Sequence, residues 1–142
     1  MSFENILVVC IGNICRSPMA EALFKQKYPE KNISSAGLEG LVGYPADPMT
    51  IECMRAIGVD VSSHVARQLD LDMLVQADIV FAMTTQQVKK IEERWSFSKG
   101  KVFRLCHWTN KNIADPYRKD MQDFILAKDL AQEGVRDWSL RL

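Results

Sequence analysis

The feature that most constrains the fold is an uninterrupted apolar run, Ile6-Leu7-Val8-Val9, which leads into a cysteine-containing turn. Such a run is typical of a strand buried on both faces of a parallel sheet. Apolar residues then recur at helical spacing from Met19 to Tyr28, which predicts a helix. The segment between them is therefore a strand-to-helix turn at the carboxyl end of a strand.

The turn combines a nucleophile with an anion-binding backbone. It runs Cys10-Ile11-Gly12-Asn13-Ile14-Cys15-Arg16-Ser17-Pro18, so five residues separate a cysteine from an arginine. Unpaired N–H groups and the helix dipole attract an anion at this position. A thiol in the same place ionises readily. The combination predicts cleavage of a phosphate ester through a cysteinyl-phosphate intermediate.

Several residues of the turn suit this chemistry. Arg16 offers a planar, permanently charged fork for two phosphoryl oxygens, and the Ser17 hydroxyl is placed to donate to the Cys10 thiolate. Gly12 permits a close approach or a backbone conformation that a Cβ would block, and Asn13 tolerates a positive φ. The other expected substrate-binding residues of the turn are Ile11, Ile14 and Cys15.

Two alternatives remain for the turn. A cysteine and an arginine at this spacing can occur by chance between a strand and a helix. A nucleotide-binding phosphate loop is the other possibility, but its pattern G-x-x-x-x-G-K-[ST] is absent from the sequence.

The acid that would protonate the leaving oxygen is expected in Asp115-Pro116-Tyr117. This tripeptide lies just beyond the fourth predicted strand, and hence at the same edge of the sheet as Cys10. Pro116 stiffens the loop, and Tyr117 offers a ring for stacking on an aryl substrate. Taken alone, Asp-Pro-Tyr is an ordinary turn; beside a cysteine phosphate loop, Asp115 is the candidate general acid.

Predicted strands and helices alternate along the chain. The strands are expected at Asn5–Cys10, Asn32–Ala36, Ile79–Met83 and Lys101–Cys106. The helices are expected at Met19–Tyr28, from Pro48 (capped by Asp47) to a stop at Gly58, at Asp70–Gln76, at Gln86–Trp95 (capped by Thr84 or Thr85) and at Met121–Leu140. Alternation with right-handed crossovers predicts an α/β fold, a doubly wound four-stranded parallel sheet with helices on both faces. Without a linker or a repeat, residues 1–142 are expected to form one domain.

Composition excludes several classes of function. The chain has 18 Lys and Arg against 18 Asp and Glu, so it lacks the positive excess of a nucleic-acid-binding protein. No apolar stretch approaches the roughly 20 residues of a membrane span, and no signal peptide is evident, which predicts a cytoplasmic protein without membrane insertion. The four cysteines form no zinc pattern, so neither a metal nor a cofactor is expected, and Cys53 and Cys106 are expected to be small buried residues.

The chain resembles a low-molecular-weight protein tyrosine phosphatase over nearly its whole length. The matching segments are Val9 to Pro18, Ser35-Ala36-Gly37, Ser63 to Gln68 and Asp115-Pro116-Tyr117. The first segment, followed by a distant Asp-Pro, distinguishes this family from the larger cysteine phosphatases. The resemblance implies a protein tyrosine phosphatase with Cys10 as nucleophile, Arg16 as phosphate clamp, Ser17 as thiolate partner and Asp115 as general acid.

The resemblance also implies supporting and substrate-binding residues. Asn13, held in relatives by the residues at Ser35 and His64, would lock the loop in a strained shape. From the residues alone, His64 would be a structural histidine, and neither interpretation makes it a catalytic base. Leu41 and Tyr117 fall where relatives build the walls of the phosphotyrosine slot.

Two further segments, Ala46-Asp47-Pro48 and Asp115 to Lys119, together with leucine at position 41, resemble the bacterial branch encoded with capsule and exopolysaccharide machinery. The implied partner is the tyrosine-rich tail of an autophosphorylating bacterial kinase, with the phosphatase acting as a monomer. Relatives often have an acid where this chain has Thr84, which puts any contact made by that acid in doubt.

Two other functions on this scaffold are weighed against the phosphatase. An arsenate reductase relays oxidation through two further cysteines after the third strand, and residues 84–100 contain none. A non-catalytic phosphate-binding module would have lost the cysteine, the arginine or the aspartate, and all three are present. A separate hypothesis is that Cys15 protects Cys10 from oxidation by forming a disulfide with it.

Overall fold

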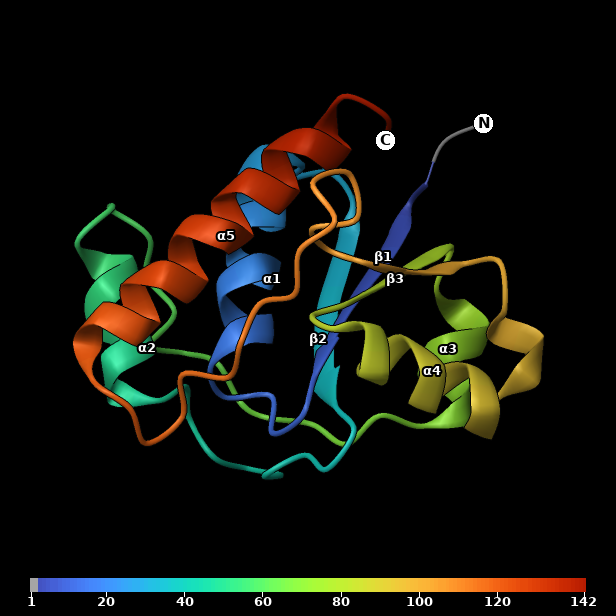
Figure 1. Ribbon diagram of the computed structural model, residues 1–142, viewed down its shortest axis with the longest axis horizontal. Coiled ribbons are helices and arrows are strands. Elements are labelled where there is room, and N and C mark those ends of the chain that lie inside the picture. The colour runs from blue at the N-terminus through green and yellow to red at the C-terminus, as the bar shows by residue number, and fades with distance from the viewer. Residues whose placement is uncertain (1–2) are drawn as a thin grey trace.

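The computed structural model describes residues 3–142, so the first two residues of the predicted domain lie outside it. The elements are β1 (Asn5–Cys10), α1 (Arg16–Lys27), β2 (Asn32–Gly37), α2 (Pro48–Arg55), α3 (Leu71–Gln76), β3 (Ile79–Ala82), α4 (Thr85–Arg94), the 3-10 helix η1 (Ser96–Ser98), β4 (Val102–Arg104) and α5 (Met121–Ser139). Every predicted strand and helix is present, in the predicted order (Figure 1).

The four strands form one parallel sheet in the order β2-β1-β3-β4. The chain moves outward from β1 to β2 and then crosses to β3 on the other side of β1. Cys10 therefore ends the strand at which the winding reverses, where ligands bind in folds of this kind. The predicted α/β fold class is confirmed.

Strand β4 is shorter than the predicted Lys101–Cys106. Leu105 still donates to the carbonyl of Ala82 at 2.8 Å, but His107 N then bonds to the carbonyl of Arg104 and closes a turn. The edge strand therefore ends where its backbone begins to bond to itself.

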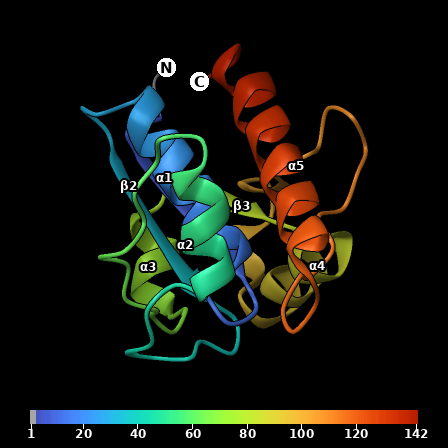
Figure 2. The same ribbon diagram turned by 90° about the vertical axis from the view of Figure 1, so that its left-hand side faces the viewer.

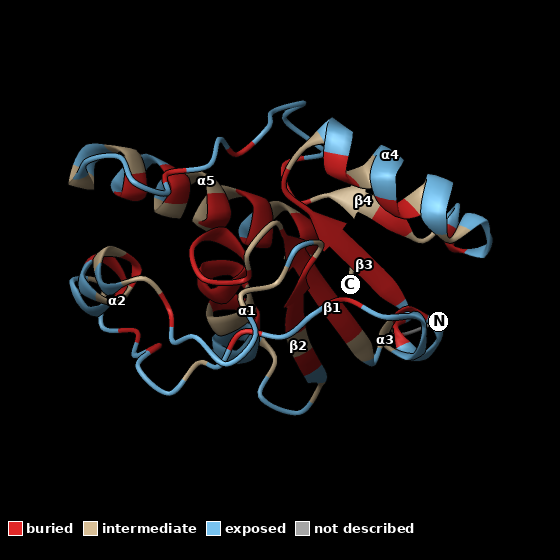
Figure 3. Cartoon of the chain, turned by 90° about the horizontal axis from the view of Figure 1, so that it is seen from below, coloured by how far each residue is buried: buried red, intermediate tan, exposed pale blue. Residues whose placement is uncertain are grey.

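Helices cover both faces of the sheet, with α1, α2 and α5 on one side and α3 and α4 on the other (Figures 1 and 2). Side chains of a strand alternate between its faces, so Ile6 and Val8 pack in the cluster with α1 and α5, while Leu7 and Val9 pack in the second cluster. Buried residues gather in the sheet and on the helix faces turned toward it (Figure 3).

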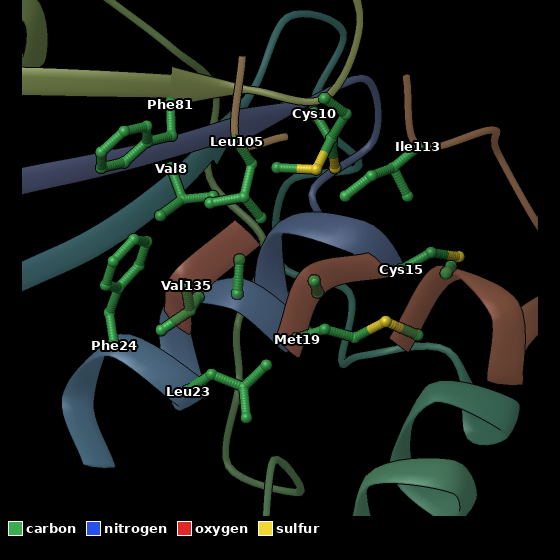
Figure 4. Close-up of a cluster of buried hydrophobic side chains, with 14 of the residues drawn as sticks. Val8, Cys10, Cys15, Met19, Leu23, Phe24, Phe81, Leu105, Ile113 and Val135 are labelled. Carbon is green, nitrogen blue, oxygen red and sulfur yellow. The ribbon is translucent and has the colours of Figure 1, made fainter. Parts of the chain in front are cut away.

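The larger cluster extends to the carboxyl end of β1. Phe24 of α1 stacks on Phe81 of β3, with ring centroids 5.2 Å apart. Figure 4 shows Cys10, Cys15 and Ile113 at one end of this cluster, away from these rings. The core thus ends directly beneath the cysteine loop.

Polar side chains cap the helices as the sequence predicts. Asp47 accepts from Met49 N at the start of α2, and Asp70, predicted as the first residue of α3, is its cap. Thr84 Oγ1 accepts from Gln87 N at 3.2 Å and caps α4, which an acid at that position would also do. Helix α1 begins three residues before the predicted Met19, because Pro18 needs no hydrogen-bond partner in the first turn.

All four cysteines are free and buried. Cys53 and Cys106 lie in the core, as predicted, and the Cys106 thiol donates to the carbonyl of Leu130 at 3.2 Å. Among residues 3–142, no helix has the length and apolar content to cross a membrane.

Candidate active site

The cysteine loop connects the end of β1 to the first residue of α1, so its position is fixed by both elements. Gly37 of β2 lies opposite Cys10 in the sheet register. A Cβ on Gly37 would collide with the carbonyl of Ile11, so this glycine is what lets the loop pass close to β2. A Cβ on Gly12 would lie 3.5 Å from Leu41, an ordinary contact, so the protein itself does not demand glycine there.

Two donors converge on the sulfur of Cys10. Ser17 Oγ lies 2.9 Å from Cys10 Sγ and accepts from Asn13 Nδ2 at 2.7 Å. Because the Asn13 amide nitrogen can only donate, the Ser17 hydroxyl hydrogen is left for the sulfur. The backbone N–H of Asn13 also donates to the sulfur, at 3.3 Å. Both bonds are made to the atom that would act as the nucleophile.

Asn13 holds the loop in a left-handed turn, as the sequence predicts, with φ of 62°. Its Nδ2 donates to Ser35 Oγ at 2.8 Å, and its Oδ1 accepts from the Arg67 backbone N–H at 2.8 Å. His64 Nε2 donates to the Asn13 carbonyl at 2.7 Å. The structure thus brings the predicted Ser35 and His64 to Asn13, and every polar group of the Asn13 side chain is paired.

Glu21 forms a further layer behind this network. Its carboxylate accepts from the Ser35 hydroxyl and lies 3.9 Å from His64 Nδ1. Lys25 Nζ pairs with the same carboxylate at 2.5 Å. A hollow of about 410 Å³ reaches Glu21, Ser35 and His64 from this side, so the support of the loop borders solvent.

Arg16 is buried beside the loop and is only partly paired. Its Nη1 donates to the carbonyl of Ile113 at 2.8 Å, and its Nη2 lies 3.6 Å from Asp115 Oδ2. The Nε–H is buried and has no hydrogen-bond partner within residues 3–142. An unpaired buried donor on a positive charge is a site for an oxyanion.

Cys10 borders a pocket of about 280 Å³. The pocket is lined by the predicted residues Cys10, Ile11, Gly12, Ile14, Cys15, Arg16, Leu41, Asp115 and Tyr117, together with Glu39. The Asn13 and Ser17 side chains are fully buried and bond to the loop itself rather than lining the pocket.

The candidate acid lies on the rim of this pocket. The Asp115 side chain is 47% exposed, and its Oδ1 accepts from Tyr117 N at 3.1 Å. The Arg118 guanidinium lies 5.2 Å from the centre of the Tyr117 ring. Ile113, which is fully buried, donates its N–H to the carbonyl of Met83 and so fixes the start of the loop at the end of β3.

The other cysteines are held as neutral thiols. Burial, and then the negative charges of Asp47, Cys10 and Asp115, raise the pKa of the Cys15 thiol. Burial raises the pKa of Cys106 to about 11 and also raises the pKa of Cys53.

Four residues around the site escaped the sequence reasoning: Glu21, Glu39, Arg67 and Ile113. The Ile113 carbonyl and the Arg67 N–H act as backbone groups, which leave no mark on residue type, while Arg67 Nε also donates to the Ser35 carbonyl at 3.0 Å. Glu21 lies within the first predicted helix, where an acid has many roles. For Arg67, the signal lay in the matching segment Ser63 to Gln68.

Comparison with known proteins gives the family. A sequence model of the low molecular weight phosphotyrosine protein phosphatases matches residues 5–142. The chain belongs to this family. It is accordingly a protein-tyrosine-phosphatase, a phosphoric monoester hydrolase.

Relatives from bacteria match over almost their full length. The chain is 53% identical to the low molecular weight protein-tyrosine-phosphatase Ptp of Acinetobacter johnsonii, over 98% of each chain. It is 45% identical to the probable phosphatase EpsP of Ralstonia nicotianae, over 98% of this chain and 96% of that one. The predicted bacterial branch of the family is confirmed.

Solved structures agree with this assignment. Vibrio vulnificus Wzb in complex with benzylphosphonate superposes with a TM-score of 0.95, at 35% identity over 99% of this chain and 100% of that chain. The YwlE arginine phosphatase from Geobacillus stearothermophilus superposes with a TM-score of 0.91, at 30% identity over 97% and 92%. The low-molecular-weight phosphatase fold therefore accommodates more than one kind of phosphorylated side chain.

Proposed function

We propose that the protein hydrolyses phosphotyrosine in protein substrates through a phosphocysteine intermediate. The observation that carries this is the buried, unpaired Nε–H of Arg16, a residue that lines the same pocket as Cys10 and Asp115. A nucleophile, an oxyanion donor and an acid then surround one phosphoryl group.

In the first step, the Cys10 thiolate attacks phosphorus in line with the leaving oxygen. The Arg16 fork and the loop N–H groups hold the equatorial oxygens, whose charge they stabilise. As the bond to the phenolic oxygen breaks, the Asp115 carboxylic acid gives that oxygen its proton. The products are a dephosphorylated tyrosine side chain in the substrate protein and S-phosphocysteine at position 10.

In the second step, Asp115, now a carboxylate, removes a proton from water, and the hydroxide attacks the phosphorus. The bond between sulfur and phosphorus breaks and releases inorganic phosphate. Ser17 donates to the departing sulfur and so stabilises the regenerated thiolate.

Variants of the three residues test this mechanism with p-nitrophenyl phosphate and phenyl phosphate. Cys10→Ser and Arg16→Ala are expected to abolish turnover, and Asp115→Asn to lower kcat on phenyl phosphate, whose leaving group needs protonation, by about 10²–10⁴-fold. Acid quenching during turnover traps phosphate on Cys10, which mass spectrometry detects. Turnover by Cys10→Ser would contradict the mechanism.

The proposed substrate class rests on the shape of the pocket. Leu41 and Tyr117 line it together with Cys10, and an aromatic ring fits between apolar walls. Phosphoserine is too short to reach Cys10 while contacting both walls, and a displacement of about 1 Å costs about 10²-fold in rate. Matched peptides that carry phosphotyrosine, phosphoserine or phosphoarginine compare these classes; equal turnover of phosphotyrosine and either rival would refute the assignment.

The proposed partner is the tyrosine-rich tail of an autophosphorylating bacterial kinase that controls capsule or exopolysaccharide production. The resemblance to the bacterial branch supports this role, and a single cytoplasmic, monomeric domain over residues 1–142 is part of the proposal. The Asp115→Ala protein is used to retain phosphotyrosyl proteins from its own organism. Recovery of such a kinase is expected, and its absence among the proteins retained would count against the role.

A further inference from the structure

An exposed apolar surface adjoins the pocket. Val42 is 65% exposed, Tyr44 59% and Val65 59%, and these three residues define what we call the apolar ledge. Val42 and Tyr44 belong to the rim loop, residues 41–47, whose first residue, Leu41, lines the pocket. The segment that carries Val42 and Tyr44 therefore starts at the apolar wall of the pocket.

The rim loop is fixed at both ends to the cysteine loop. Leu41 N donates to the carbonyl of Gly12 at 3.0 Å, and Asp47 N donates to the carbonyl of Ile14 at 2.8 Å. Between these bonds, Tyr44 N donates to the carbonyl of Leu41 at 3.0 Å and closes a turn. Val42 and Tyr44 are thus exposed on a segment that is tied down.

The third ledge residue is brought to the same place by backbone pairing. Gly43 N donates to the carbonyl of Ala66 at 3.0 Å, and Ala66 N donates to the carbonyl of Tyr44 at 2.9 Å. Ala66 is buried, while its neighbour Val65 remains exposed. The three exposed side chains are therefore carried by two segments that lie side by side, and Val65 also lines the hollow that reaches Glu21 and His64.

A protein substrate must cover this surface. With its phosphate at Cys10, a phosphotyrosine lies between Leu41 and Tyr117, and the polypeptide on either side of it has to cross the rim of the pocket. The turn keeps Tyr44 Cα within about 7 Å of Leu41 Cα. An extended peptide advances about 3.3 Å per residue, so a residue about two positions from the phosphotyrosine reaches the ledge.

We propose that the apolar ledge formed by Val42, Tyr44 and Val65 selects phosphotyrosine substrates that carry a large apolar or aromatic side chain about two residues from the phosphotyrosine. Such a side chain leaves water on contact with the ledge, which strengthens binding. The rim loop is rigid, so little ordering cost opposes the contact. The inference rests on the proposed function and adds the chemistry of the flanking residue.

The test compares two phosphotyrosine peptides that differ only in having leucine or serine two residues before and two residues after the phosphotyrosine. For the wild-type protein, kcat/KM is expected to be about tenfold higher with the leucine peptide. In the double variant Val42→Ser/Tyr44→Ser the two peptides are expected to become equal, with kcat/KM for p-nitrophenyl phosphate unchanged. Val65→Ser alone is expected to reduce the preference in the same direction.

The matched control is Leu71→Ser/Val75→Ser, which removes two residues of similar exposure from α3 on the other face of the sheet. It is expected to keep the full preference. Equal rates with both peptides for the wild-type protein, or an undiminished preference in the ledge variants, would overturn the inference while leaving the proposed function intact. If the wild-type protein did not turn over p-nitrophenyl phosphate, both the inference and the proposed function would be overturned.

Sedimentation tests whether a second copy of this chain, rather than a substrate peptide, covers the ledge. The wild-type protein and Val42→Ser/Tyr44→Ser are expected to sediment alike. A wild-type dimer that the double variant dissociates would assign the ledge to a second copy of this chain and overturn the inference.

Discussion

Arg16 Nη1 donates to the backbone carbonyl of Ile113 at 2.8 Å, so the side chain proposed to grip phosphate also holds the loop that carries Asp115. The bond joins residues 97 positions apart in the chain. It couples the position of the phosphate clamp to the position of the acid.

Replacing Arg16 with lysine is expected to lower kcat by far more than a change of hydrogen-bond geometry alone would. Lysine keeps the charge but offers a single nitrogen, which cannot bond to Ile113 and hold phosphate in a forked geometry at once. We expect kcat on p-nitrophenyl phosphate to fall by about 10²–10³-fold. Arg136→Lys, an exposed change on α5, is the comparison. Activity of Arg16→Lys near that of the wild type would show that the fork is not needed.

The acid loop has a second attachment, through Asn112. Its Oδ1 accepts from Thr85 N at 3.0 Å and from Arg104 Nη1 at 3.1 Å, which fixes the residue before Ile113 to α4 and β4. We expect Asn112→Ala to misplace Asp115 and to lower kcat on phenyl phosphate more than on p-nitrophenyl phosphate, whose leaving group needs less protonation. The neighbouring Lys111→Ala is the control. Equal losses on both substrates would assign Asn112 a role unrelated to the acid.

Oxidation is expected to be reversible because of Cys15. Peroxide converts the Cys10 thiolate to a sulfenic acid, and the Cys15 thiol then displaces water from it to form a disulfide. Burial raises the pKa of Cys15, so it remains a thiol while Cys10 reacts. Dithiothreitol should restore activity to the oxidised wild-type protein and to Cys53→Ser, but only slightly to Cys15→Ser. Equal recovery in all three would remove the hypothesis.

Stability is expected to depend on pH through Asp78. Its Oδ2 accepts from Asn5 N at 2.8 Å and from Glu4 N at 2.9 Å, and these bonds, that of Asn5 first, lower the pKa of the carboxyl. The contribution is therefore present above the unfolded value of about 3.9 and is lost as pH falls through the folded one.

Urea unfolding measures this effect. Asp78→Asn is expected to lose about 1 kcal/mol at pH 7, because solvent screens bonds to an exposed carboxylate. The difference from the wild type should shrink below about pH 4. Glu93→Gln, an exposed change on α4, controls for the loss of charge. A difference that persists unchanged at pH 2 would refute the linkage.

Local chemistry predicted much of this molecule. The positive φ at Asn13 and the caps at Asp47 and Thr84 follow from what each residue type can do by itself, and the structure has them where predicted. The strand order was constrained by handedness and by the alternation of elements. The sequence could not predict contacts made by backbone groups. The carbonyl of Ile113 is an example, because any residue at that position presents the same oxygen.

Glu21 was missed for a different reason. Its contacts with Ser35 and His64 depend on how three segments are brought together in space, and no spacing in the sequence records that arrangement. Ser35 and His64 themselves entered only through the resemblance to the family.

The pairing of Asn13 has a consequence for how this protein folds. Its partners Ser35, His64 and Arg67 follow it by 22, 51 and 54 residues, and Arg16 bonds to a residue 97 positions away. Contacts between residues so distant in sequence form late, since each closes a long stretch of chain. Without these contacts, Asn13 would leave its left-handed conformation, which is unfavourable for a residue other than glycine. The cysteine loop therefore has its working shape only in a completely folded chain, and during refolding the recovery of activity should trail the recovery of helical signal.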